Sequence, residues 1–267
     1  MADRLKVADL GSGAGISSDG YANYFDVTGF DNDPKVERYY PYEFRQVDVL
    51  TLTADDLREF DMVHLGGPCQ PWSRMSSCRP GLRERYTDLI EPLRPVLVAS
   101  GVPYVIENVE GAPLVDPVRL CGLMFGKELY RHRLFEAGNG LAIPPLRHPA
   151  HVLPASRAGH WVPGTVMSIA GHIAPISMAR ELMGVTRYVP REMLKEAAPA
   201  YMTAYVASFA AAYLSAEAAL WTPSATARWC CPASSGPAGR CGCSTTRRPA
   251  WSRGTSPTRC SGSCSRR

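Results

Sequence analysis

The stretch 65–73, LGGPCQPWS, is the part of this chain that decides which fold we expect. The run before it, 61–65 (DMVHL), is short and apolar, which is typical of a buried strand. Gly-Gly-Pro then forms a stiff loop that presents Cys69 at the carboxyl end of this strand. Open α/β sheets bind ligands at that edge. We therefore expect a ligand-facing thiol at position 69, and a buried cysteine that only packs is the alternative.

A glycine-rich loop follows the first expected strand. The run 5–10 (LKVADL) reads as a strand, 11–15 (GSGAG) as a turn, and the apolar-periodic residues beyond it as a helix. Glycines let a backbone approach a ligand closely, and a helix amino terminus favours electronegative groups. The glycine spacing differs from the dinucleotide fingerprint, so the loop indicates either a cofactor site or a plain turn.

Acidic residues stand at the ends of the first three expected strands. Asp9 is in the first, Asp31 follows 27–30, and Asp48 follows 44–47. Carboxylates at one sheet edge repel each other unless a ligand with donors lies between them, and an acid at the position of Asp31 suits ribose hydroxyls. Capping of the next helix is the alternative for these acids.

Two later strands add charged residues to this edge. The run 102–106 (VPYVI) leads into Glu107, so a carboxylate from an adjoining strand is expected beside the thiol of Cys69. The run 131–135 (RHRLF) places Arg131 and Arg133 on one face of a strand. These arginines favour phosphate contact, with a solvated charged face as the alternative.

Composition indicates a globular protein with a distinct carboxyl-terminal segment. With 45% hydrophobic and 20% charged residues the chain is of ordinary globular type. No apolar run approaches the roughly 20 residues that span a bilayer, and no signal-peptide core is found, so we expect a cytoplasmic protein with no membrane contact. Residues 1–217 carry 21 basic and 25 acidic side chains, and eight arginines follow with no acid. A nucleic-acid surface must therefore be a local patch.

Four segments are expected along the chain. They are a catalytic and cofactor-binding core over 1–135, a small irregular insertion over 136–175, helices returning to the core over 176–221, and a disordered Arg/Ser/Cys-rich tail over 222–267. We hypothesise that this tail is translated from a shifted reading frame. The helices are expected at 86–100, 176–184, 190–197 and 199–220, and 111–126 is expected to be irregular.

No metal site is expected. Histidines stand at 132, 148, 151 and 160, but no two share a tight ligand spacing with a cysteine, and the Cys-x-Cys at 241–243 lacks a second pair.

Taken together, these segments resemble the DNA (cytosine-5)-methyltransferase family, and in particular its small phage-borne members. The chain departs from that pattern in its late part: 180–184 (RELMG) is similar to a late family element, but 198–201 (APAY) replaces the usual Gly-Asn, and Leu129 stands where the family often has Gln. The resembling motifs occur in family order: 9–15 (DLGSGAG), Asp31 with Asp48, 67–73 (GPCQPWS), 107–109 (ENV) and 131–135.

The resemblance implies a Rossmann-like S-adenosylmethionine-dependent methyltransferase fold with a small irregular target-recognition insertion. It implies that Cys69 attacks C6 of a cytosine flipped out of double-stranded DNA, and that C5 then receives the methyl group. Glu107 would hold the N3 edge of the base, and Arg131 and Arg133 would support base and phosphates, with Arg131 the nearer to Glu107. We expect a monomer, in a restriction–modification setting of a bacterial or phage-infected cell.

The resemblance also assigns the remaining site residues. S-adenosylmethionine would contact Asp9, Gly11, Gly13, Gly15, Asp31, Asp48 and Pro68, and the substrate would contact Gln70, Ser73 and Asn108. Three alternatives stay open: methylation of tRNA, a folate-dependent pyrimidine hydroxymethylase, and a catalytically silent DNA-binding homologue.

Overall fold

The computed structural model describes residues 4–73, 81, 85–157, 160–169 and 172–221. The expected tail over 222–267 and most of the polar loop after Ser73 lie outside the described residues. The strands are β1 (Lys6–Leu10), β2 (Asp26–Asp31), β3 (Glu43–Gln46), β4 (Met62–Gly66), β5 (Tyr104–Asn108), β6 (Val118–Cys121) and β7 (His132–Gly138).

All seven strands belong to one sheet with the order β3-β2-β1-β4-β5-β7-β6. The strands from β3 to β5 in that order are parallel, and β7 runs antiparallel between β5 and β6. Parallel strands joined by crossovers, with the order reversing at β1, confirm the expected Rossmann-like α/β class. The reversal between β1 and β4 lies at the edge that carries the glycine loop and Cys69.

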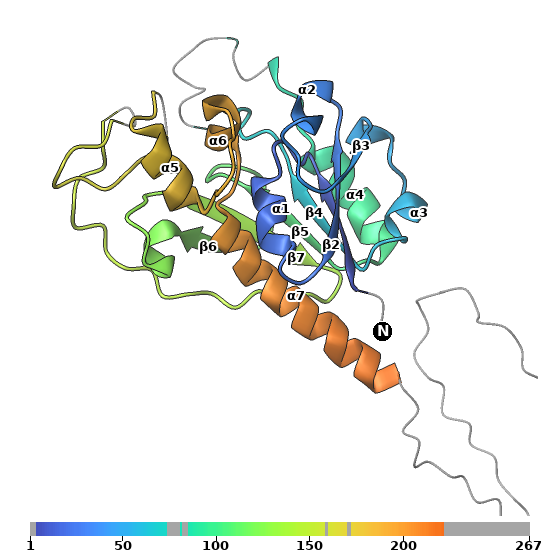
Figure 1. Ribbon diagram of the computed structural model, residues 1–267. Helices are drawn as coiled ribbons and strands as arrows, with labels where there is room; N and C mark the ends of the chain where they lie inside the picture. Colours follow the sequence, from blue (N-terminus) through green and yellow to red (C-terminus); the bar gives the residue numbers. More distant parts are fainter. Residues whose placement is uncertain (1–3, 74–80, 82–84, 158–159, 170–171, 222–267) are drawn as a thin grey trace, which may run out of the picture. The chain divides into compact units, whose positions relative to one another are not determined.

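Helices cover both faces of this sheet (Figure 1). The described helices are α1 (Ile16–Tyr21), α2 (Pro34–Glu37), α3 (Ala54–Leu57), α4 (Ile90–Ser100), α5 (Ile176–Met183), α6 (Arg191–Glu196) and α7 (Ala200–Trp221), with short 3-10 turns at η1 (Val49–Thr51) and η4 (Gly122–Phe125). None of the described helices is both long and apolar enough to cross a bilayer.

Successive side chains of a strand point to opposite faces, so the sheet has one apolar cluster on each face, and a third cluster packs around α5 and α6. The face toward α1 and α7 buries a cluster that includes Val7, Met62, Val105, Tyr21 and Met202. The face toward α3 and α4 buries a cluster that includes Ala8, Val63, Ile106, Leu57 and Leu97.

Helices α1 and α7 cross in close contact at Gly20. A Cβ added to Gly20 would lie 2.1 Å from Oγ1 of Thr203 and 2.2 Å from the carbonyl oxygen of Ala200. Only a residue without a side chain fits there, so Gly20 sets how closely α7 packs on the sheet.

The structure differs from the sequence-based expectation in two elements. The run 111–126 contains β6 and η4, although its glycines and prolines predicted irregular structure. The cause is non-local, since β6 pairs with β7 in the register Leu120 to Arg133. Helix α4 was expected to begin at 86 but begins at Ile90. At that start the carboxylate of Asp88 accepts a hydrogen bond from the Ile90 amide at 2.9 Å.

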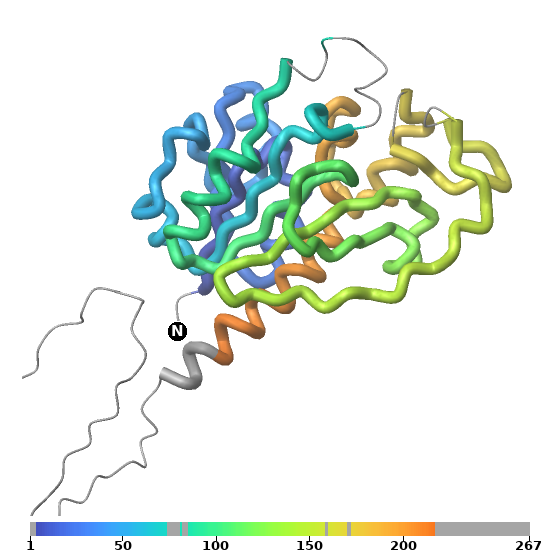
Figure 2. Tube along the Cα trace, turned by 180° about the vertical axis from the view of Figure 1, so that it is seen from behind, coloured from blue at the N-terminus to red at the C-terminus, as the bar shows by residue number. Residues whose placement is uncertain are grey.

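The segment between β7 and α5 has little regular structure in its described residues. Isolated bridges such as Ala155 to Val166 take the place of strands. The trace seen from behind shows this segment passing along the β6 and β7 side of the sheet (Figure 2).

Candidate active site

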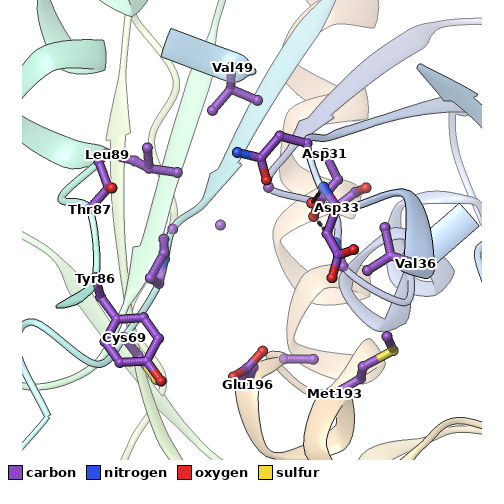
Figure 3. Close-up of a pocket in the computed structure, with 18 of the residues that line it drawn as sticks. Asp31, Asp33, Val36, Val49, Cys69, Tyr86, Thr87, Leu89, Met193 and Glu196 are labelled. Atoms are coloured by element: carbon purple, nitrogen blue, oxygen red, sulfur yellow. Dashed lines mark hydrogen bonds between the residues drawn. The ribbon is translucent and has the colours of Figure 1, made fainter. Parts of the chain in front are cut away.

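A cavity of about 490 Å³ opens at the carboxyl ends of the parallel strands. Figure 3 shows Asp31 and Asp33 on one side of it, Cys69 and Tyr86 on the other, and Glu196 and Met193 of α6 below. The expected site residues that line it are Gly11, Gly13, Asp31, Asp48, Pro68, Cys69, Gln70 and Glu107.

The glycine loop forms one wall of the cavity and is tied to the end of β2. Gly11 has a φ of 72°, and a Cβ there would lie 2.3 Å from the carbonyl oxygen of Gly66. The amide of Gly13 donates to the Asp31 carboxylate at 3.0 Å, and the amide of Asp33 donates to the other Asp31 oxygen at 3.0 Å. Two backbone donors thus hold the Asp31 carboxylate against the loop and at the cavity.

Asp48 caps the turn that follows it, as the alternative above allowed, and so does Asp33, two residues after Asp31. Asp33 caps α2 by accepting from the Lys35 amide at 2.9 Å, and Asp48 caps η1 by accepting from the Leu50 amide at 3.0 Å. Both residues line the cavity as well. Their carboxylates are therefore oriented by the turn that each one begins.

Two residues expected at the cofactor do not line this cavity. Asp9 is 1% exposed, and its carboxylate accepts a hydrogen bond from the hydroxyl of Ser18 in α1. The reason is the strand period, which turns the Asp9 side chain toward α1 rather than toward the strand end. Gly15 has a φ of 75° and packs on Tyr40 and Pro41, so it serves the turn into α1.

The pairing of β4 with β5 brings Cys69 and Glu107 to the same cavity. Gly66 is the register partner of Glu107, and Cys69 follows three residues later. The carbonyl oxygen of Cys69 accepts from the amide of Ser73 at 2.8 Å, which turns the chain after the thiol.

Asn108 and Ser73, both expected to contact substrate, contact the loop that carries Cys69. The Asn108 side-chain amide lies 3.4 Å from the carbonyl oxygens of both Gly67 and Pro68. Ser73 does not line the cavity and closes the turn described above. Gln70 does line it, and donates at 2.8 Å to the carboxylate of Glu196.

Glu107 forms a buried ion pair with Arg133, not with Arg131. Nε of Arg133 lies 2.7 Å from Oε1 of Glu107, and the two side chains are 5% and 6% exposed. Arg131 instead donates to the carbonyl oxygens of Ala197 at 3.1 Å and Lys195 at 2.6 Å. The expectation that Arg131 lies nearer to Glu107 is thus wrong, because Arg131 is taken up by the chain between α6 and α7.

Burial and charge act in opposite directions on the two reactive groups. Burial raises the pKa of the Cys69 thiol, while the guanidinium groups of Arg133 and Arg131 act to lower it. Burial likewise raises the pKa of Glu107, and Arg133 opposes that rise. Two cations thus lie close enough to favour the charged forms of both the carboxyl and the thiol, against the effect of burial.

Helix α6 completes the cavity with residues that sequence reasoning did not assign to the site. Glu196 and Met193 line it, and burial raises the pKa of the Glu196 carboxyl. A helix was expected over 190–197, but no local pattern indicates that it returns to a loop more than 120 residues earlier. The hydrogen bond between Gln70 and Glu196 exists only in the tertiary structure.

The sheet and its cavity define a chain of the Rossmann-like methyltransferase fold. It is similar to the solved structure of a DNMT2 mutant from Spodoptera frugiperda, with a TM-score of 0.51 and 13% identity over 77% of this chain and 99% of that one. It is also similar to the methyltransferase EhMeth of Entamoeba histolytica, with a TM-score of 0.52 and 12% identity over 79% of this chain and 99% of that one. No protein-family profile and no curated protein matches the sequence.

Proposed function

We propose that this protein transfers a methyl group from S-adenosylmethionine to C5 of a cytosine flipped out of double-stranded DNA. The observation that carries the proposal is the meeting of Cys69 and Glu107 at one cavity that also contains the glycine loop. A thiol, a carboxyl and a glycine-lined wall are the parts that this chemistry needs. All of them come from a single chain, which fits a monomer.

The described residues fit a nucleoside-containing methyl donor. Gly13 leaves the backbone open to close approach, Asp31 offers carboxylate oxygens to ribose hydroxyls, and Asp48 lies at the same wall for the adenine amino group. When bound, S-adenosylmethionine supplies an electrophilic methyl group. Pro68 would lie between the donor part of the cavity and Cys69.

Cys69 and Glu107 would act on the cytosine ring. The thiolate of Cys69 would add to C6, which moves electron density to C5. C5 would then bond to the methyl carbon as the bond from that carbon to the donor's sulfonium sulfur breaks, and the donor would leave as the neutral thioether S-adenosylhomocysteine. Glu107, held by Arg133, would hydrogen-bond the N3 and amino edge of the base and stabilise the charge that develops there. Removal of the C5 proton by a base and departure of the thiolate restore the aromatic ring and free Cys69.

Two arginines would support these two groups: Arg133 lies in β7, and Arg131 directly precedes it. Arg133 fixes Glu107 through their ion pair and also donates to the carbonyl oxygen of Glu196 at 3.1 Å. Arg131 joins the strand to the chain after α6. We therefore assign Arg133 to hold the carboxyl and Arg131 to hold the wall of the cavity.

Trapping on a fluorinated base tests the covalent step. A duplex oligonucleotide with 5-fluorocytosine and the folded protein with S-adenosylmethionine should give a covalent adduct that denaturing electrophoresis resolves. Cys69→Ser should give none, and Glu128→Gln, a change at an exposed side chain, should give as much as the unchanged protein. Absence of any adduct with folded, donor-bound protein would refute the covalent mechanism.

Transfer of labelled methyl groups then distinguishes the substrates. We expect label in duplex DNA that contains unmodified cytosine. Label in tRNA alone would keep the chemistry and replace the DNA substrate, and label in neither would favour a silent nucleic-acid-binding protein.

A further inference from the structure

Four side chains with metal-binding atoms meet at one place outside the cavity. They form what we call the Cys–His cluster: Cys121, His132, His148 and His151, with one ligand atom of each within 4.8 Å of the others. Sγ of Cys121 lies 3.6 Å from Nε2 of His151, and Nε2 of His132 lies 3.0 Å from Nε2 of His148. None of the four lines the candidate active site.

Three segments of the chain build this cluster. Cys121 ends β6, His132 begins β7, and the two are register partners in the antiparallel pair. His148 and His151 come from the irregular segment that follows β7, where they stand in a His-x-x-His spacing. Because side chains alternate along a strand, His132 points away from the face that carries Arg133 and its ion pair.

We propose that the Cys–His cluster binds one Zn²⁺ ion in a closed, four-coordinate structural site. With Zn–N near 2.0 Å and Zn–S near 2.3 Å, tetrahedral coordination separates ligand atoms by about 3.3–3.6 Å. The two separations given above are 3.0 and 3.6 Å and every pair lies within 4.8 Å, so small rotations of the side chains would bring the four ligand atoms to that range. One thiolate and three imidazoles suit zinc in both ligand type and number, and they leave no coordination position open for catalysis.

Neighbouring groups orient the ligands as they do in zinc proteins. Nδ1 of His132 lies 3.2 Å from a carboxylate oxygen of Glu110, which leaves Nε2 for the metal. The ring of Tyr130 stacks on His151 with centroids 3.9 Å apart and planes 9° apart. Cys121 is fully buried, so its thiolate would be screened from water.

Hydrogen bonds alone satisfy the cluster less well than a metal ion does. Only one proton can lie between the Nε2 atoms of His132 and His148, and a thiol is a weak donor to His151. A Zn²⁺ ion contacts all four ligand atoms at once. Bound there, it would fasten the segment 139–156 to β6 and β7.

The expectation of no metal is revised by this geometry. It depended on the absence of a cysteine close to a histidine in the sequence, whereas the fold gathers these ligands from positions 121 to 151. The spacing of His148 and His151 is the one local signal that pointed to a site.

Metal content of the full-length protein tests the proposal. The chain is produced with zinc in the medium and freed of loosely bound metal, and zinc is then measured by mass spectrometry. We expect about one equivalent per chain in the unchanged protein and less than about a third of that in Cys121→Ser and in His148→Ala. His160→Ala, at a histidine of the same segment outside the cluster, and Cys241→Ser, at a tail cysteine, should keep the full content.

A second measurement covers variants that fail to fold. His151→Ala removes a ligand whose side chain is exposed, and circular dichroism reports whether it folds. After exchange into Co²⁺, the unchanged protein should show the intense visible bands of tetrahedral cobalt together with thiolate charge transfer, and His151→Ala should lose the tetrahedral pattern. Less than a tenth of an equivalent of zinc in folded unchanged protein, or full zinc content in the three cluster variants, would overturn the proposal.

Discussion

At the scale of single residues, the proposed chemistry depends on the environment of two side chains. Glu107 is buried and paired with Arg133 at 2.7 Å, so its carboxyl is held in one orientation at the cavity. Burial raises its pKa, and the guanidinium groups of Arg133 and Arg131 act against that rise. Burial also raises the pKa of Cys69, which disfavours its thiolate. The guanidinium groups of Arg133 and Arg131 act in the opposite direction and favour the thiolate.

Glu107→Gln tests this arrangement. The amide keeps the shape, but it carries no charge and no transferable proton, and it leaves Arg133 without its ion-pair partner. We expect kcat for methyl transfer to fall by roughly 10²- to 10³-fold, the loss typical of one removed transition-state donor. Steady-state kinetics with labelled S-adenosylmethionine measures it, with Glu128→Gln as the control. A loss smaller than threefold would contradict the assigned role.

At the scale of elements, the contact between α1 and α7 positions the glycine loop. Helix α1 starts directly after the loop, and its Gly20 touches the backbone of α7. The hydroxyl of Thr203 donates to the carbonyl oxygen of Ser17 at 2.8 Å at the same crossing. The wall of the cavity thus depends on the last long helix of the described chain.

Gly20→Ala is expected to destabilise the protein through this contact. The added methyl group would overlap Thr203 and the α7 backbone, and such overpacking costs about 1–3 kcal/mol of unfolding free energy. Gly126→Ala is the control, because a Cβ there meets no atom within 4 Å and only the φ of 67° opposes it. Urea denaturation measures both losses: Gly126→Ala reports the backbone strain alone, about 1–2 kcal/mol. A Gly20→Ala variant as stable as the unchanged protein would show that the α1–α7 contact is not tight.

At the scale of the whole molecule, burial acts on Asp9 of β1 and His64 of β4, which are register partners at the centre of the sheet. Burial raises the pKa of Asp9 to about 7 and lowers the pKa of His64 to about 3. Between about pH 4 and 7 the folded protein therefore holds the Asp9 proton more tightly than the unfolded chain does, so this residue makes stability fall as pH rises. His64 acts in the other direction, because the unfolded chain binds its proton below about pH 6.5.

Asp9→Asn isolates the first of these effects. Its stability relative to the unchanged protein should increase as pH rises from 4 to 7, by at most roughly 4 kcal/mol at about 1.4 kcal/mol per pKa unit. Denaturation at pH 4, 6 and 8 measures the change. Asp26→Asn, at an exposed carboxylate, should show a difference that does not vary in this way. A pH-independent difference for Asp9→Asn would mean that Asp9 is not protonated in the fold.

The sequence by itself determined the succession of parallel strands, the glycine loop after β1, and the placing of Cys69 and Glu107 at one sheet edge. Each of these follows from local rules, since strand alternation and Gly or Pro turns act over a few residues. The pairing of β4 with β5 then follows from the expected class of fold, in which these two strands are neighbours. The four helices expected at 86–100, 176–184, 190–197 and 199–220 begin within four residues of those bounds for the same reason, whereas α2, α3 and η4 were not predicted.

Only the tertiary structure decided which charged and polar groups meet. Asp9 turned out to face α1, Arg133 rather than Arg131 paired with Glu107, and Glu196 came to Gln70 from a distant helix. The strand β6 and the Cys–His cluster likewise arise from the pairing of β6 with β7 and the return of the segment after it. These contacts join residues far apart in the chain. The free energy that selects them comes from packing of the whole fold, and a local sequence pattern carries no information about that packing.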